Sequence, residues 1–204
     1  MIRALRFLLR MALLLGCLAL VYFAATYKPL RVVVPNLAPV ECITDQICID
    51  DPNRAAEATR LYREALAFVN TEVGEIENPP RAYFCAGKVC SDYFGLGKVA
   101  AYAASTRGIV IKPNGWKDYI VRHELIHHLQ AERLGSVGLF LRPEWFREGM
   151  AYSLSRDPRR PLPAQFGLET LRANFEAWYA GIKPEDIWTE AQKLTRDQKN
   201  LPSN

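Results

Sequence analysis

The sequence predicts a single domain of the α+β class, in which a small twisted sheet packs on one helix and a helical C-terminal part follows. One transmembrane helix is expected in front of this domain. Residues 1–28 contain a long run without charge, and residues 81–113 hold short β-branched and aromatic stretches broken by glycines. Beyond residue 115, apolar residues recur at helical spacing. The predicted domain therefore changes from sheet to helix near residue 115.

The N-terminal segment, residues 1–28, is predicted to anchor the chain in a membrane. Three arginines precede an apolar run of 17 residues from Met11 to Tyr27, which is at the short end of what spans a bilayer. Ala24 and Thr26 make a poor small-x-small cleavage pair, so an uncleaved anchor is favoured over the alternative, a cleaved signal peptide. The arginines would then stay in the cytoplasm and the domain would lie outside it, in a bacterial periplasm.

The charge balance excludes one class of partner. The chain has 26 basic and 22 acidic residues, but four of the basic ones lie within residues 1–28, so the remainder is formally neutral. Nucleic-acid binding calls for a concentrated basic face, and none is indicated. We expect residues 29–50 to form a linker, residues 51–198 one domain and residues 199–204 a tail.

The cysteines of the domain come as two close pairs, Cys42 with Cys48 and Cys85 with Cys90. An even number of cysteines suits an oxidising compartment, and the two local disulfides are favoured among three possible pairings. Free buried thiols are the remaining alternative. A zinc site of four thiolates is excluded, because neither pair has the two-residue gap of such sites.

The segment after the anchor is rich in proline, which indicates an extended linker with one short strand at residues 31–34. Asp50, Asp51 and Pro52 signal the start of a helix that ends near Gly74. Four strands of the sheet are predicted next, at residues 82–85, 88–93, 99–105 and 108–112.

Glycine and proline mark the helices of the C-terminal part. The helix that follows residue 115 is ended by Gly135, and Pro143 starts a second helix. Residues 168–179 form an apolar stripe at helical spacing, and Pro184 opens the last helix. These last two helices are predicted to pack in the core or to line a substrate cleft.

The first of these helices carries the three histidines of the chain in the segment Ile120–Leu129. His123 and His127 lie one helical turn apart, so both imidazoles would face one point, as two ligands of zinc do. Glu124 would project beside the metal, where it can take the proton of a water molecule held on the zinc. His128 would point away from the metal. The alternative is a core helix whose histidines satisfy one another or their neighbours.

The third ligand is expected in the segment Pro143–Ala151. An HExxH motif followed at this distance by Trp-x-x-Glu-Gly-x-Ala resembles the gluzincin branch of the zincin metallopeptidases, peptidase clan MA. The resemblance implies a zincin-like domain in which Glu148 is the third zinc ligand. Glu144, one turn earlier, is the rival. The metzincin enzymes are excluded, because Gln130 and Arg133 stand where that family has a glycine and a histidine.

The sequence departs from the gluzincin pattern at Tyr152, where several members have an aspartate that orients a ligand histidine. The orienting group would then come from elsewhere, either Asp157 or a backbone carbonyl. Tyr152 could instead donate a hydrogen bond to the oxyanion of the reaction, which makes it a candidate catalytic residue, or it could pack in the core.

The resemblance implies a zinc metallopeptidase, membrane-anchored and extracytoplasmic, in which water on the zinc hydrolyses a peptide bond with Glu124 as general base. A peptide or protein substrate would lie along an edge strand of the sheet, by position Val99–Ser105. Two alternatives stay open: a catalytically inert zinc-binding interaction module, and a disulfide-held structural domain without metal.

Overall fold

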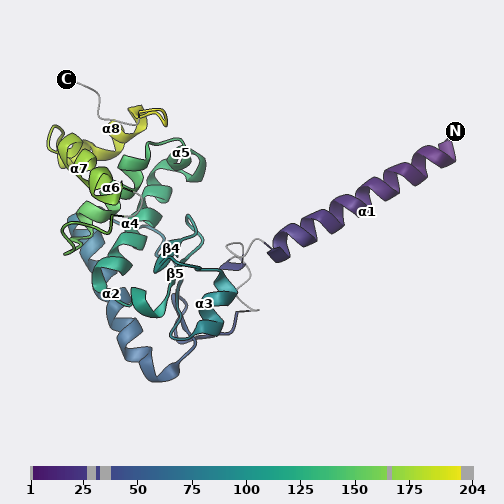
Figure 1. Ribbon diagram of the computed structural model, residues 1–204, viewed down its shortest axis with the longest axis horizontal. Helices are drawn as coiled ribbons and strands as arrows, with labels where there is room; N and C mark the ends of the chain where they lie inside the picture. The colour runs from purple at the N-terminus through teal and green to yellow at the C-terminus, as the bar shows by residue number, and fades with distance from the viewer. Residues whose placement is uncertain (1, 27–30, 33–37, 165–166, 199–204) are drawn as a thin grey trace.

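The computed structural model describes residues 2–26, 31–32, 38–164 and 167–198, and it is mostly helical with a small mixed sheet (Figure 1). The predicted α+β class is therefore wrong, because helices predominate and the sheet is small. Strands of two or three residues make up the sheet, whereas four helices between residues 55 and 179 have eleven or more residues each. Helix packing consequently supplies most of the core.

The N-terminal helix, α1 (Ile2–Thr26), stands apart from the other helices in Figure 1. Among the residues described here, no helix is both long and apolar enough to cross a membrane. Only residues 11–26 of α1 are free of charge, and at 1.5 Å per residue they reach about 24 Å, short of the roughly 30 Å of a hydrocarbon core. The predicted transmembrane helix, and the membrane-anchored location derived from it, are wrong.

Five strands form the sheet in the spatial order β1-β2-β3-β5-β4. They are β1 (Glu41–Cys42), β2 (Ile47–Ile49), β3 (Ala82–Phe84), β4 (Ala101–Ala103) and β5 (Ile109–Ile111). The three inner strands are parallel and fully buried, whereas the two outer strands run antiparallel to their neighbours. β4 is half-buried at one edge, so one side of its backbone faces away from the sheet.

The sheet begins earlier in the chain than expected. β1 and β2 lie within residues 29–50, for which a linker was predicted. The strand expected at residues 31–34 is not seen where it can be checked: Arg31 and Val32 form a 3-10 turn, and residues 33–34 lie outside the described part.

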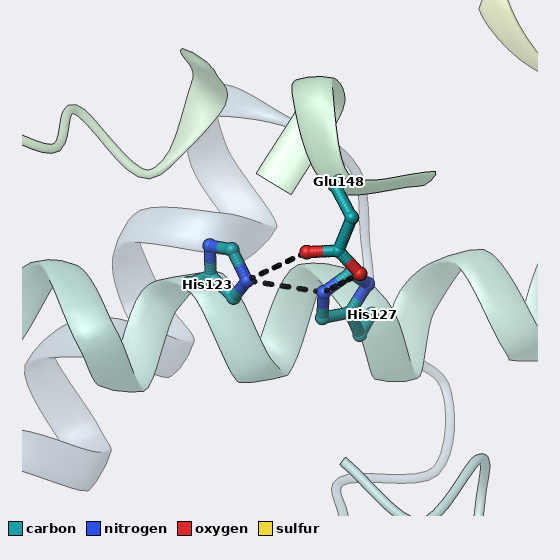
Figure 2. Close-up of side chains that lie close together, drawn as sticks. All are labelled: His123, His127 and Glu148. Carbon is teal, nitrogen blue, oxygen red and sulfur yellow. Dashed lines mark hydrogen bonds and ion pairs between the residues drawn. The ribbon is translucent and has the colours of Figure 1, made fainter. Parts of the chain in front are cut away.

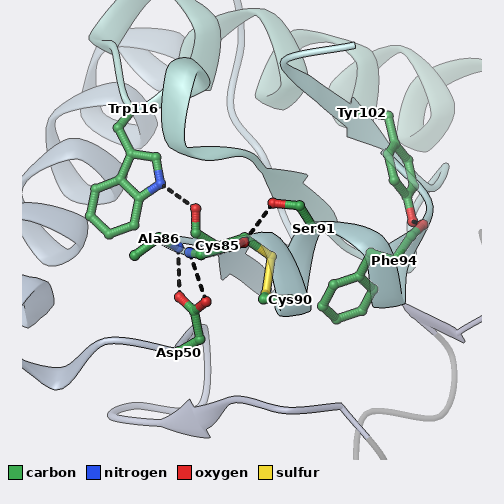
Figure 3. Close-up of a disulfide and its surroundings, with 9 residues drawn as sticks. Asp50, Cys85, Ala86, Cys90, Ser91, Phe94, Tyr102 and Trp116 are labelled. Atoms are coloured by element: carbon green, nitrogen blue, oxygen red, sulfur yellow. Dashed lines mark hydrogen bonds between the residues drawn. A yellow bond between two sulfur atoms is a disulfide. The ribbon is translucent and has the colours of Figure 1, made fainter. Parts of the chain in front are cut away.

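The strand predicted at residues 88–93 is instead the helix α3 (Lys88–Phe94). Its buried side chains are Cys90, Ser91 and Phe94, a helical spacing, while Val89 is exposed. Figure 3 shows why the chain turns here: the carboxylate of Asp50 accepts hydrogen bonds from two successive backbone N–H groups just ahead of the helix. These bonds hold Ala86 and Gly87, the two residues that precede α3, and so fix where the helix begins.

The two local disulfides are confirmed. Cys42 and Cys48 are directly opposite one another across β1 and β2 and are bonded, and the bond between Cys85 and Cys90 joins the end of β3 to α3 (Figure 3). Both bonds are compatible with an extracytoplasmic location.

Two long helices cover the sheet and share its hydrophobic core. α2 (Ala55–Glu72) follows the 3-10 turn η3 (Pro52–Arg54), whose N-terminus is capped by the Asp51 carboxylate. α4 (Asp118–Leu134) follows the 3-10 turn η4 (Pro113–Gly115). Gly135 ends α4 with a φ of +70°, which a glycine adopts without strain. The buried side chains of α2 are Ala58, Leu61, Tyr62, Ala65 and Val69, and they recur with the helical period that predicted this helix.

The C-terminal part adds α5 (Ser136–Phe140), α6 (Glu144–Leu154), α7 (Leu168–Tyr179) and α8 (Ile187–Lys193). A 3-10 turn, η6 (Pro184–Asp186), precedes α8. α6 and α7 pack so closely at Gly149 that a Cβ there would lie 2.2 Å from the carbonyl oxygen of Leu171. The glycine after Glu148 is therefore required by packing, and it fixes the face that α6 turns towards α4.

Candidate metal centre

The helix α4 presents the imidazoles of His123 and His127 side by side on one face. Their Nε2 atoms are 3.1 Å apart and their ring centroids 4.7 Å apart (Figure 2). Both side chains are mostly buried, with exposed fractions of 12% and 17%. Two imidazole nitrogens that converge so closely can bind one cation together, as the spacing in the sequence predicts.

The helix α6 brings the carboxylate of Glu148 to the same point. Its Oε2 lies 3.7 Å from Nε2 of His123, and its Oε1 lies 3.6 Å from Nε2 of His127 (Figure 2). One ligand atom from each of the three residues falls within 4.8 Å of the others. Glu144, the rival, lies outside this group, although it lines the same cleft.

The spacing of the three ligand atoms suits a small tetrahedral cation. Ligands at 2.0–2.2 Å from zinc in tetrahedral geometry lie about 3.3 Å from one another. The three separations here, 3.1, 3.6 and 3.7 Å, bracket that value. The group can therefore bind a metal ion with little rearrangement.

His127 and Glu148 shift each other's pKa towards the ionised form. Burial lowers the pKa of His127, but the charge and the hydrogen bonding of Glu148 outweigh burial and raise that pKa to about 9. Burial alone would raise the pKa of Glu148, but the two histidines hold it well below its usual range. A metal cation that binds here takes the place of the proton on His127.

The carboxylate of Glu124 lies beside the three ligands on α4 and is 5% exposed. Burial raises its pKa, opposed by the charges of His123 and His127 and by the backbone N–H of Ala103 in β4. A carboxylate with a raised pKa, next to a metal position, is suited to accept and return a proton.

Gln130 orients His127, a role that its place in the sequence did not predict. Its Oε1 lies 2.9 Å from Nδ1 of His127, and its Nε2 donates to the backbone carbonyls of Phe146 and Arg147 in α6. Because these carbonyls fix which end of the amide is the acceptor, Nδ1 donates to Gln130, and Nε2 is the nitrogen that faces the metal position and gives up its proton when a metal binds. The sequence shows only an amide three residues after a ligand histidine, and the contacts with α6 that give it this role are visible only in the fold.

Two polar side chains near the metal centre, one of them the predicted orienting group Asp157, contact other residues instead. Asp157 hydrogen-bonds Arg159 rather than a histidine. His128, predicted to point away from the metal, is buried and donates from Nε2 to the carbonyl oxygen of Asn78 at 2.9 Å. It fixes the loop before β3 to α4.

Tyr152 lies against the metal ligands. Its ring centroid is 4.4 Å from that of His123, and its side chain lines the cleft. Burial, together with the charge of Glu148, raises the pKa of Tyr152 to about 12. The hydroxyl therefore keeps its proton at neutral pH and is available as a hydrogen-bond donor.

No protein-family model matches the sequence, and neither a curated protein nor a solved structure is significantly similar to it. The resemblance to the gluzincins therefore depends on the two motifs and their spacing, and membership of that group stays a prediction.

A cleft of about 1150 Å³ opens over the three ligands. All three residues of β4 line one wall, and residues of α4 and α6 line the opposite side. Tyr119, near the start of α4, lies at one end with Arg159 beside its ring, and Ser136 and Phe140 of α5 lie beyond the other end of α4. An extended chain placed in the cleft would pass between the edge strand and the three ligands.

Proposed function

We propose that this protein is a zinc-dependent peptidase. The observation that carries the proposal is the convergence of two imidazoles and a carboxylate beside a buried Glu124, in a cleft with an open edge strand. Two nitrogens and one oxygen are the ligand set of many catalytic zinc sites, which keep a fourth position for water or substrate. The same donors also suit other divalent metals, so the choice of zinc is part of the proposal.

The edge strand β4 supports a peptide as substrate. Backbone hydrogen bonds pair Ala104 with Gly108 and Ala100 with Lys112, so the N–H and C=O groups of Ala101 and Ala103 point away from β5. The N–H of Ala103 already faces the carboxylate of Glu124, so an extended peptide could pair with the groups of Ala101 and with the C=O of Ala103 and add a strand to the sheet. Its backbone would then pass the ligand group at the position of Glu124.

A bound zinc ion would polarise the scissile carbonyl and lower the pKa of a water molecule. Glu124 accepts the proton of the attacking water and then delivers it to the leaving amine. The raised pKa of Glu124 suits this exchange, because the protonated carboxyl must persist until the amine takes the proton. The hydroxyl of Tyr152 donates a hydrogen bond to the carbonyl oxygen as negative charge develops there.

The experiment compares the zinc-loaded full chain with its Glu124→Gln variant on a denatured protein and on a peptide library. We expect wild type to cleave both and the variant to lose about 10²–10⁴-fold in kcat/KM while it still binds zinc. Glu144→Gln is the matched control, since Glu144 lines the same cleft but lies outside the ligand group. It should keep most of the activity.

Two outcomes would contradict the proposal. Activity that survives in Glu124→Gln, with zinc retained, would remove the assigned general base. Full zinc occupancy without cleavage of any peptide by wild type would favour the inert interaction module instead.

A further inference from the structure

The guanidinium of Arg159 is fixed at one end of the cleft. Its Nε lies 2.9 Å and 3.1 Å from the two carboxylate oxygens of Asp157, and its Nη2 contacts the same carboxylate. Its carbon Cζ stands 5.2 Å from the ring centroid of Tyr119. The Asp157 side chain is 2% exposed, whereas the Arg159 side chain is 38% exposed and lines the cleft. Asp157 therefore acts as a buried support for an arginine that faces the cleft.

The guanidinium of Arg159 still has N–H donors that could bind a ligand. Asp157 engages Nε and Nη2, and Nη1 bonds to no residue in the described ranges. A guanidinium held in one orientation loses little conformational entropy when it binds an anion, and it presents parallel donors that match a carboxylate. Lys98 also lines the cleft, just before β4, so the balance of charge at this end is positive.

The direction of β4 relates this end of the cleft to the direction of a bound peptide. Ala100, just before β4, lies against Gly115 ahead of α4, where a Cβ would be 2.5 Å from its carbonyl oxygen. Ser105, just after β4, has its Oγ 2.5 Å from Oγ of Ser136, beyond the end of α4. β4 therefore runs from the end near Tyr119 towards α5.

Antiparallel pairing is the more stable form of strand addition. A peptide antiparallel to β4 runs from α5 towards Tyr119 and Arg159. The part of the substrate that follows the scissile bond would therefore lie at the arginine end.

We propose that Arg159, supported by Asp157 and Tyr119, binds a carboxylate of the substrate on the C-terminal side of the scissile bond. This inference rests on the proposed peptidase function and names a class of substrate for it. The carboxylate can belong to a Glu or Asp side chain or to the C-terminus of a short peptide, because the guanidinium recognises the same group in both.

The experiment uses peptides that share one sequence cleaved by the wild-type full chain. One series carries Glu or Gln at each of the first three positions after the cleaved bond, and a second ends in a free carboxylate or an amide. We expect the acidic member of at least one pair to have a kcat/KM about tenfold higher, the size of a charge-assisted hydrogen bond. The series that shows the preference identifies the source of the carboxylate.

Arg159→Gln should abolish this preference while cleavage of the neutral peptides changes little. Arg160→Gln is the matched control, because its neighbouring guanidinium pairs with Glu176 and does not line the cleft. It should keep the preference. An equal preference in Arg159→Gln and wild type, or a preference for acidic residues before the cleaved bond, would overturn the inference while the peptidase function stands.

Binding separates this inference from the peptidase proposal. The affinity of the zinc-loaded Glu124→Gln variant for the Glu and Gln peptides can be measured by fluorescence anisotropy without turnover. An Arg159-dependent preference for the acidic peptide, in a protein whose wild type cleaves nothing, would support the carboxylate site and contradict the peptidase. Equal affinities for the two peptides would overturn the carboxylate site.

Discussion

The sheet and the metal centre are held together in different ways. Around β1, β2 and α3, two disulfides close short loops, and the Asp50 carboxylate holds the start of α3. Around the metal centre, α4 and α6 meet through the amide of Gln130 and through side-chain packing. The first region is cross-linked covalently, whereas the second depends on how closely α6 fits between α4 and α7. Disturbing one region should therefore leave the other largely intact.

The largest expected effect is that of Gly149→Ala. The added Cβ would lie 2.2 Å from the carbonyl oxygen of Leu171, so α6 must move away from α7 and carry Glu148 with it. We expect a loss of about 3 kcal/mol of unfolding free energy and weaker zinc binding, measured by denaturant unfolding and by titration. Gly138→Ala is the control: its Cβ would meet only ordinary contact, 3.8 Å from Leu134, and should be close to neutral.

Removal of the disulfide between Cys85 and Cys90, by substituting both with serine, should cost about 2 kcal/mol of stability, because it closes a short loop. Zinc affinity should change little, since the disulfide links β3 to α3 and neither cysteine belongs to the helices that carry the metal ligands. A loss of zinc affinity as large as that of Gly149→Ala would contradict the separation of the two regions.

Gln130→Leu removes the amide that orients His127 while it keeps the volume of the side chain. Loss of a group that orients a metal ligand lowers metal affinity about 10–100-fold. We expect a loss in that range, measured by competition with a zinc chelator, with Gln192→Leu on the exposed face of α8 as control. Unchanged affinity would show that α4 positions the histidine without help.

The smallest expected effect is on the stability of the fold at acidic pH. Burial raises the pKa of Glu132, but hydrogen bonds from the Asn78 side chain and from the backbone N–H groups of Asn78 and Glu77 outweigh burial and lower it. Because the folded-state pKa is depressed, this stabilisation is present above the unfolded-state pKa and is lost as the pH falls through the folded-state pKa. Its size is a few tenths of a kcal/mol after solvent screening. Glu132→Gln should flatten the acid limb of a stability profile by that amount.

Local spacing in the sequence was enough to predict the helix of the metal centre. His123 and His127 lie one turn apart, the Gly135 that ends α4 was anticipated, and Glu148 joins them from a helix that Pro143 starts. These features depend on residues within one or two turns of each other or on a motif with a known partner distance.

Features that depend on distant contacts were missed. Residues 88–93 have the composition of a strand, but a helix forms because Asp50 holds the two residues ahead of it and Cys90 bonds Cys85. β1 and β2 are too short to show a period of two. Gln130 could not be recognised as an orienting group, because its role depends on two carbonyls of α6.

The measurement that tests the metal centre most directly is zinc titration of the full chain, with direct metal analysis. We predict one zinc ion per chain, lost in His123→Ala, His127→Ala and Glu148→Gln and retained in Glu144→Gln, because three ligand atoms converge and Glu144 is outside their group. Absence of stoichiometric zinc, or zinc that depends on Glu144 and not on Glu148, would contradict this account.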